Sequence, residues 1–280
     1  MTRSAMMGAL ALMLASSAFG GSIFLTGHDP DFHAQLGGNL SGARNINTIA
    51  IGYTMDAAFN PYVAGGADKF LFVESKISPP GGHVNGVNGI VASGYTAGTD
   101  FEHHDAATLA SELDLLGTKY GAIVVASDFG GVLTAAELNI LNSRSADIIS
   151  FLNHGGGIYA MANSNSQAQL TSGATAYGYL PFVVTAPQVN QNETGFTVTA
   201  FGASLGLANS DVNGNASHNV FAATFGMQIV DVDASGRILS LATRSRIDDD
   251  EGVVPEPSSA LLLLAGVGLV VFLGRRRPQR

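Results

Sequence analysis

The sequence contains no cysteine and no tryptophan, and it is poor in basic residues. Without thiols the chain cannot form disulfides, bind a metal through sulfur or use a cysteine nucleophile. Its 13 lysine and arginine residues stand against 22 acidic ones, and five of the basic residues lie in the two terminal segments. The central part is therefore strongly acidic and would repel a phosphate backbone, which excludes nucleic acid as a partner.

The first twenty residues have the pattern of a secretory signal peptide. Arg3 supplies a positive start, an apolar run extends from Ala5 to Ala15, and small residues lead to Gly20. The run is too short for a transmembrane helix, so we predict cleavage after Gly20. A signal peptide implies the Sec translocon and signal peptidase as partners in export through the inner membrane.

The C-terminus combines three features in a fixed order. An acidic, proline-containing linker occupies residues 248–257, an apolar segment residues 258–274, and a basic tail residues 275–280. The prolines hold the linker extended, and the apolar segment is near the short limit for a transmembrane helix. Arginines beyond it place the tail in the cytoplasm. The predicted sorting motif is Pro255, Glu256 and Pro257, and the predicted basic stop is Arg275, Arg276 and Arg277.

This arrangement resembles the PEP-CTERM sorting signal of Gram-negative bacteria. The resemblance implies that an exosortase recognises the Pro255-Glu256-Pro257 motif and removes the helix. The product would reach the cell surface or the extracellular space. The resemblance also implies an association with exopolysaccharide, because such proteins commonly occur in bacteria that make it. A plain single-pass anchor with a proline-containing linker is the alternative.

Residues 21–247 are long enough for one domain with a sizeable core. Helical spacing predicts a helix over 107–116, and a Thr134/Glu137 capping box predicts a second that ends near Asn153. A strand, a helix, a glycine turn and a strand form a βαβ unit. We predict an α/β fold, a flavodoxin-like three-layer sandwich with a mostly parallel sheet and extra C-terminal β-strands. Short apolar runs predict strands at 23–27, 48–53, 70–73, 122–126, 158–161, 182–185, 195–199, 227–232 and 238–243. Glycine-rich stretches at 78–89 and 208–216 are predicted to be surface loops.

Residues 120–164 resemble class I glutamine amidotransferase-like domains, including the ThuA-like branch. The resemblance is carried by residues 120–125, Leu133-Thr134 and residues 151–162. In that superfamily the residue after the strand that follows the glycines is the nucleophile. Here that residue is Ala162, which can neither attack a substrate nor transfer a proton. The resemblance therefore implies a fold without its usual reaction, and we expect binding rather than catalysis.

Ligands of open parallel sheets bind at the carboxyl ends of the strands. The segment from His28 to His33 follows the first predicted strand there, and a later strand leads to Asp128. Imidazole and carboxylate groups suit zinc, manganese or non-haem iron. The candidate catalytic residues are His28, Asp29, Asp128 and His218, and the candidate ligands of a divalent metal are Asp31 and His33. Alternatively, the aspartates cap the next turn and the histidines are polar surface residues.

Three other segments are weaker candidates. In residues 102–105 two histidines are adjacent, so only one can face a given side of a strand. Residues 211–215 and 231–236 are similar to calcium-binding loops, but neither has the glutamate at the twelfth position. The sequence thus predicts a surface binding domain associated with the envelope or exopolysaccharide. Its rival is an exported hydrolase that uses the His28–His33 loop, with or without a divalent metal.

Overall fold

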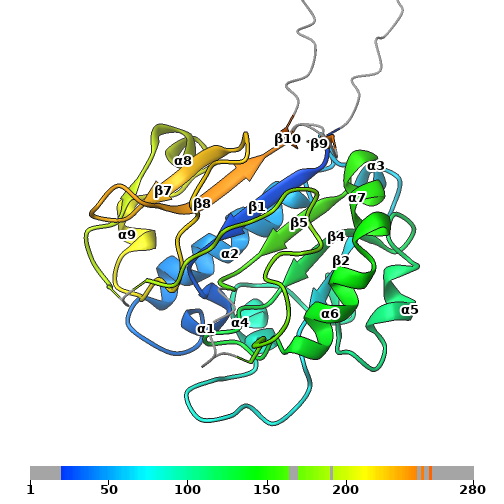
Figure 1. The fold of residues 1–280 in the computed structure, drawn as a ribbon, viewed down its shortest axis with the longest axis horizontal. Coiled ribbons are helices and arrows are strands. Elements are labelled where there is room, and N and C mark those ends of the chain that lie inside the picture. The colour runs from blue at the N-terminus through cyan, green and yellow to red at the C-terminus, as the bar shows by residue number, and fades with distance from the viewer. Residues whose placement is uncertain (1–19, 164–169, 190–191, 245–246, 249–251, 254–280) are drawn as a thin grey trace, which may run out of the picture.

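The computed structural model describes residues 20–163, 170–189, 192–244, 247–248 and 252–253. An eight-stranded sheet forms its centre, with the strand order β3-β2-β4-β5-β1-β8-β7-β6 (Figure 1). A separate pair, β9 and β10, lies beside it. The strands are β1 (Ser22–Thr26), β2 (Lys69–Val73), β3 (Phe101–His104), β4 (Tyr120–Val125), β5 (Gly157–Ala160), β6 (Thr197–Val198), β7 (Gln228–Val232), β8 (Ile238–Thr243), β9 (Ile247–Asp248) and β10 (Gly252–Val253).

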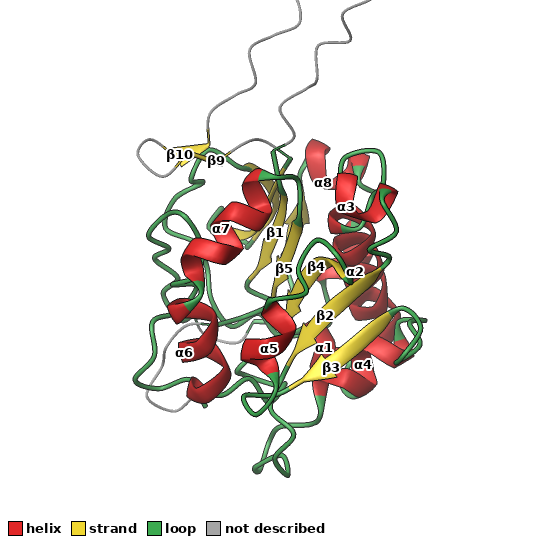
Figure 2. Cartoon of the chain, turned by 90° about the vertical axis from the view of Figure 1, so that its right-hand side faces the viewer, coloured by secondary structure: helices red, strands yellow, loops and turns green. Residues whose placement is uncertain are grey.

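Helices cover both faces of the large sheet (Figure 2). The first, second and fourth helices pack on one face, and the fifth, sixth and seventh cover the other. The helices are α1 (Pro30–His33), α2 (Leu40–Thr54), α3 (Pro61–Ala64), α4 (Gly86–Ala92), α5 (Leu109–Leu113), α6 (Ala135–Ser143), α7 (Ser145–Asn153), α8 (Ala200–Ser204) and α9 (Asn209–Val212).

The sheet is parallel in its first half and antiparallel in its second. The strands β3, β2, β4, β5 and β1 run parallel, whereas β8 pairs antiparallel with β1 and is followed by β7 and β6. Every residue of β4 is buried, as expected for a parallel strand covered on both faces. The predicted α/β class is confirmed, with a mixed sheet. The finer likeness to a flavodoxin-like fold stays a prediction.

The predicted strand over residues 48–53 is wrong, because these residues lie within α2. Threonine and isoleucine favour strands, and over so short a run they hide the helical period. The longer spacing of Ile46, Ala50 and Thr54 places buried side chains on one helical face against the sheet. Asn39 caps the helix by accepting a hydrogen bond from the backbone N–H of Gly42.

Three further predictions needed correction. The single helix expected from Thr134 to Asn153 is two helices, which meet at Arg144, although its predicted capping box is present. Residues 182–185 form no strand. The two predicted glycine-rich loops contain the start of α4 and the whole of α9. Each of these short helices was hidden by residues of low helix propensity.

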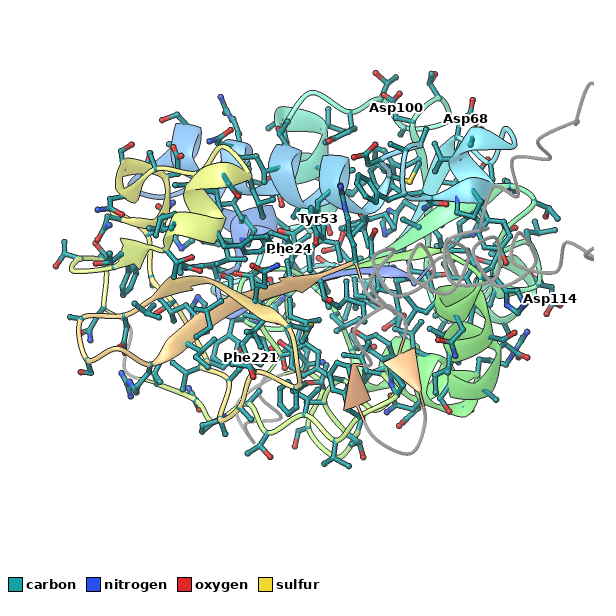
Figure 3. All side chains as sticks on the ribbon, turned by 90° about the horizontal axis from the view of Figure 1, so that it is seen from above. Phe24, Tyr53, Asp68, Asp100, Asp114 and Phe221 are labelled. Carbon is teal, nitrogen blue, oxygen red and sulfur yellow. The ribbon has the colours of Figure 1, made fainter. Side chains whose placement is uncertain are left out.

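Aromatic packing joins the sheet to α2. The ring of Phe24 on β1 meets Tyr53 of α2 and Tyr159 of β5 edge-on, with centroid separations of 6.2 and 5.7 Å. Figure 3 shows Phe24 and Tyr53 between the sheet and this helix. The core fixes the direction of β1, and this strand delivers the following segment to the carboxyl edge of the sheet.

The two edges of the sheet carry different parts of the chain. The start of β1 and the hairpin of β9 and β10 lie together near α7, at the amino edge of the parallel strands (Figure 1). Within the described residues no helix is long and apolar enough to span a membrane. The predicted transmembrane segment 258–274 lies outside the described residues, as does the predicted signal peptide apart from Gly20.

Candidate functional site

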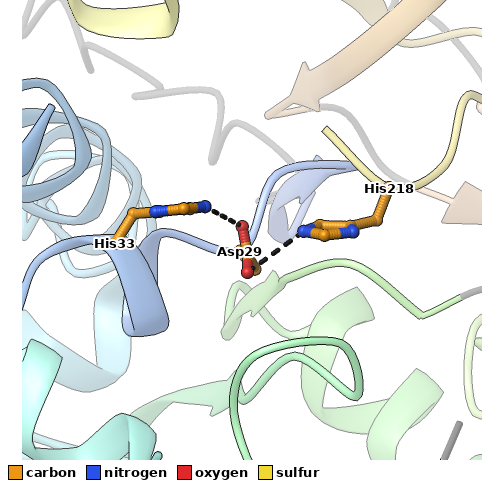
Figure 4. A group of neighbouring side chains, drawn as sticks. All are labelled: Asp29, His33 and His218. Atoms are coloured by element: carbon orange, nitrogen blue, oxygen red, sulfur yellow. Dashed lines mark ion pairs between the residues drawn. The ribbon is translucent and has the colours of Figure 1, made fainter. Parts of the chain in front are cut away.

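Three side chains from distant parts of the chain meet at the carboxyl edge of the sheet. Asp29 follows β1, His33 ends α1, and His218 lies between α9 and β7. The Nε2 atom of His33 is 3.3 Å from Oδ1 of Asp29, and Nε2 of His218 is 3.1 Å from Oδ2. Figure 4 shows the carboxylate between the two rings. One donor atom from each residue lies within 4.8 Å of the other two.

Local structure places Asp29 and His33 side by side. Asp29 is the residue before α1, and Pro30 fixes the first turn of this short helix. Residues four apart lie on one face of a helix, so His33 projects next to Asp29. The spacing of four residues between Asp29 and His33 is visible in the sequence and is the signal that predicts their contact.

His218 is delivered by a segment outside the parallel half of the sheet. Its backbone N–H donates to the carbonyl of Gly27, 2.8 Å away, which joins it to the chain just before Asp29. The ring of Phe129 stacks on its imidazole with centroids 4.4 Å apart. The backbone bond fixes the position of His218 and the stacking fixes the plane of its ring. His218 therefore faces Asp29 from the side opposite His33.

The orientation of His33 matches that of metal-binding histidines. Its Nδ1 is 3.2 Å from the carbonyl oxygen of Leu36. A carbonyl can only accept, so Nδ1 is the donor in this contact, and Nε2 is the ring nitrogen that faces Asp29. Histidine ligands of metals usually donate their second ring N–H to such a carbonyl.

The donor set and its spacing fit a divalent transition-metal ion. Two donors about 2.1 Å from one ion at a tetrahedral angle lie about 3.4 Å apart. The observed separations of 3.3 and 3.1 Å are close to that edge length, although each runs to a different oxygen of Asp29, and the three donor atoms lie within 4.8 Å of one another. Two imidazoles and one carboxylate are ligands of zinc and non-haem iron. Asp29, His33 and His218 could therefore hold one such ion.

Two more carboxyl groups, those of Asp31 and Asp128, lie near Asp29, His33 and His218, which together are called the trio. Asp31 is fully buried and accepts hydrogen bonds from the backbone N–H and the hydroxyl of Ser127, at 2.9 and 2.7 Å. Burial, helped by the charge of Asp29, raises the pKa of Asp31 to about 6. Burial also raises the pKa of Asp128 to about 7, although the Thr171 hydroxyl donates to it.

The carboxyls determine the charge of His218. Burial alone would lower the pKa of this imidazole, but the negative charges of Asp29, Asp128 and Asp31 outweigh it and raise the pKa. In the metal-free chain the neighbouring carboxylates therefore favour the protonated imidazole of His218. A bound cation would replace the proton on this ring.

Glu74 is a site residue that the sequence analysis missed. It follows β2, and its carboxylate accepts backbone hydrogen bonds from Gly86, Val87 and Val132, at 2.6, 3.0 and 2.9 Å. Burial and the nearby Asp31 raise its pKa to about 7. The sequence signal that could have identified Glu74 is its position directly after the predicted strand at residues 70–73. Through these hydrogen bonds Glu74 connects the segment that follows β2 to the loop that follows β4.

We expect the metal-free chain to lose stability as the pH rises from about 4 to about 7. Asp31, Glu74, Asp128 and His218 all have a raised pKa in the folded chain. Each binds its proton more tightly when folded, so its contribution is full below the unfolded pKa and is lost as pH passes the folded pKa. Thermal unfolding in the presence of a chelator should give a Tm several degrees lower at pH 8 than at pH 5. A higher Tm at pH 8 would contradict this.

Three of the predicted site residues are not among the three that meet: His28, Asp31 and Asp128. His28 pairs with a residue outside the trio, with Nε2 2.8 Å from Oδ2 of Asp231 on β7 and its ring edge-on to Phe196, although it lines a small cavity together with Asp29 and His33. This pair joins β1 to the antiparallel half of the sheet. Asp31 bonds Ser127 and is not one of the three residues that meet. Of the predicted residues, the structure brings together Asp29, His33 and His218.

The adjacent histidines of β3 face opposite sides, as the sequence predicts. Nε2 of His103 is 3.1 Å from the carbonyl oxygen of Glu74. His104 lies by Glu102 and Glu112, a group that could also hold a metal. However, Nζ of Lys119 is 2.7 Å from Glu102 and 3.0 Å from Glu112. A lysine already neutralises these carboxylates, which favours an ion-pair network.

The oxygen atoms of the two calcium-like loops serve local structure. Asp211, in the first turn of α9, accepts from the N–H of Ala208, and the Asn213 side chain bonds Phe196 and Asn209. In the second loop Asp233 accepts from backbone and side-chain groups of Arg237. The side-chain oxygens of Asp211, Asn213 and Asp233 therefore already accept hydrogen bonds from the protein.

Ala162 lies at the end of β5, where the amidotransferase-like resemblance places a nucleophile. It is buried, and its N–H donates to the carbonyl of His28, 3.0 Å away. Its methyl group offers no chemistry at this edge of the sheet.

Comparison with known proteins identifies the C-terminus. The family described as the PEP-CTERM protein-sorting motif matches residues 253–277. No curated protein and no solved structure matches the chain. The motif supports an exported chain that is anchored at its C-terminus before an exosortase processes it. The amidotransferase-like resemblance of the body stays a prediction.

Proposed function

We propose that this exported, exosortase-processed protein binds a divalent transition-metal ion at the cell surface through Asp29, His33 and His218. The observation that carries the proposal is the buried Asp29 carboxylate with one imidazole nitrogen facing each of its oxygens. The hydrogen bond from His33 to the Leu36 carbonyl supports it, because Nδ1 is the donor there and Nε2 is the ring nitrogen that faces the site.

The size of the space beside the trio favours ion binding over catalysis. A cavity of about 10 Å³ is lined by Asp29 and His33, among other residues. This volume accommodates about one water molecule, whereas pockets for organic substrates reach several hundred cubic ångströms. Ala162 adds no reactive group. These observations support a binding domain over the alternative, an exported hydrolase.

The position of the site suits a protein held by its C-terminus. The sorting motif begins at Val253 of β10, near the amino edge of the parallel strands. The trio follows the carboxyl end of β1, at the opposite edge. Before processing, the site would therefore lie on the far side of the body from the point where the tail begins.

Metal titration of the purified full chain in detergent tests the proposal. After treatment with a chelator, the protein should bind about one equivalent of Zn²⁺ or Co²⁺. Bound Co²⁺ should show a visible spectrum of nitrogen and oxygen ligands without thiolate bands, because the chain has no cysteine. Failure to bind either ion at micromolar concentrations would refute the proposal.

The remaining partners stay predictions. They are the Sec translocon, signal peptidase and exopolysaccharide, together with a Gram-negative host. The predicted limits of the body, residues 21–247, have the same status.

A further inference from the structure

The metal site is assembled from two segments that asparagine side chains fasten together. The backbone N–H of Asn39 donates to Oδ1 of Asn215, 2.7 Å away. In return, Nδ2 of Asn215 donates to the carbonyl of Asn39, also at 2.7 Å. Asn39 follows His33 by six residues and Asn215 precedes His218 by three. This reciprocal pair therefore links the segments that carry the two histidines.

More hydrogen bonds attach α9 to the start of α2. The Nδ2 atom of Asn39 donates to the carbonyls of Ser210 and Asn213, at 2.6 and 2.7 Å. Nδ2 of Asn45 donates to Oδ2 of Asp211, at 2.8 Å. Apolar burial here is limited to a few side chains, so a set of polar contacts holds α9 in place. Such contacts can open locally without unfolding the sheet.

The attached segment also borders the small cavity beside the site. Asp29 and His33 line one side of this cavity, and Asp211, Val212 and Asn215 line another. With a volume of about 10 Å³, it has no room for an ion with its hydration shell. An ion that enters by this route needs the segment to move away from α2.

We propose that Asn215 is a positioning residue of the metal site, and that residues 209–215 form a gate whose opening sets the rate of metal exchange. The inference rests on the proposed function. Closed, the gate borders the small cavity beside Asp29 and His33, and the bonds between Asn39 and Asn215 keep the chain that leads to His218 in place. Open, it gives the ion a path along α2. Removing the Asn215 side chain should therefore speed capture as well as release.

The experiment compares Asn215→Ala with Asn213→Ala in the full chain. Asn213 lies in the same segment, but its side chain bonds Phe196 and Asn209 and leaves the contact between Asn39 and Asn215 intact. Stopped-flow mixing with Zn²⁺ and a chromophoric chelator measures association and dissociation separately. Asn215→Ala should raise both rate constants and weaken affinity by about 10- to 100-fold. Asn213→Ala should stay close to wild type in association.

The outcomes distinguish failure of the gate from failure of the metal site. A variant that is merely destabilised would lose affinity without faster association, which would overturn the gate. Equal kinetics in wild type, Asn215→Ala and Asn213→Ala would also overturn it and leave the metal site standing. If the wild type binds no metal, the proposed function falls and the gate with it. If Asn215→Ala does not fold, Asn45→Ala replaces it, with a smaller rise in both rate constants expected.

Discussion

Replacing His218 with alanine should lower the affinity for Zn²⁺ by about 100- to 1,000-fold. Structural zinc sites bind with about 10–16 kcal/mol through four ligands, so each ligand contributes about 2.5–4 kcal/mol. His33→Ala should have a similar effect, because its ring faces the second oxygen of the same carboxylate. Asp29→Asn keeps the size of the side chain and removes its charge, and it should weaken binding as strongly. Competition against a chelator of known affinity measures all three.

His83→Ala is the matched control. This histidine lies at the same edge of the sheet, with Nε2 3.3 Å from the carbonyl oxygen of Asp128, and it is not one of the three residues that meet. Its loss should leave metal affinity within about twofold, as for an ordinary surface substitution. If His83→Ala weakens binding as much as His218→Ala, the trio is not the site. Circular dichroism of every variant separates loss of ligands from loss of fold.

Deleting residues 254–280 should abolish membrane retention and exosortase processing. This deletion removes all but the first residue of the matched sorting motif, including the whole apolar segment and its arginines. Without an apolar stretch of roughly 17–25 residues, a chain has no means of stopping in the bilayer. Cell fractionation should then find the truncated protein in soluble fractions, and mass spectrometry should find no further C-terminal cleavage.

Replacing Pro255, Glu256 and Pro257 with alanine is the sharper test of sorting against plain anchoring. These substitutions leave the apolar segment and the basic tail unchanged. The variant should therefore stay in the membrane at full length while the wild type is shortened. Equal processing of the two proteins would remove the motif from the mechanism. Unchanged membrane retention after the complete deletion would contradict the anchor itself.

Much of the sheet could be predicted from local pattern. The runs that became β2, β4, β5, β7 and β8 are largely apolar, and each contains aromatic or β-branched residues, which favour strands. The Thr134 capping box is equally local and was found where it was predicted. Residues 48–53 were misassigned because their composition favours a strand, whereas the buried face they share with Ile46 lies outside that short window.

The candidate site was only half predictable. Asp29 and His33 stand four residues apart, so their meeting follows from one helical turn. His218 lies far from them in the sequence, and no local pattern distinguishes it from His28, which pairs with Asp231 instead. The burial of Glu74 likewise depends on loops that come together only in the folded chain.

The amino-acid sequence by itself determined the export and anchoring of this protein, because a short apolar segment between prolines and arginines acts through length, hydrophobicity and charge alone. Its α/β class follows from the same kind of local pattern. Only the tertiary structure decided which histidines share a carboxylate. Which histidines these are depends on the direction in which the chain continues after β1. It also depends on the contacts that hold residues 209–219 beside Gly27 and Asn39.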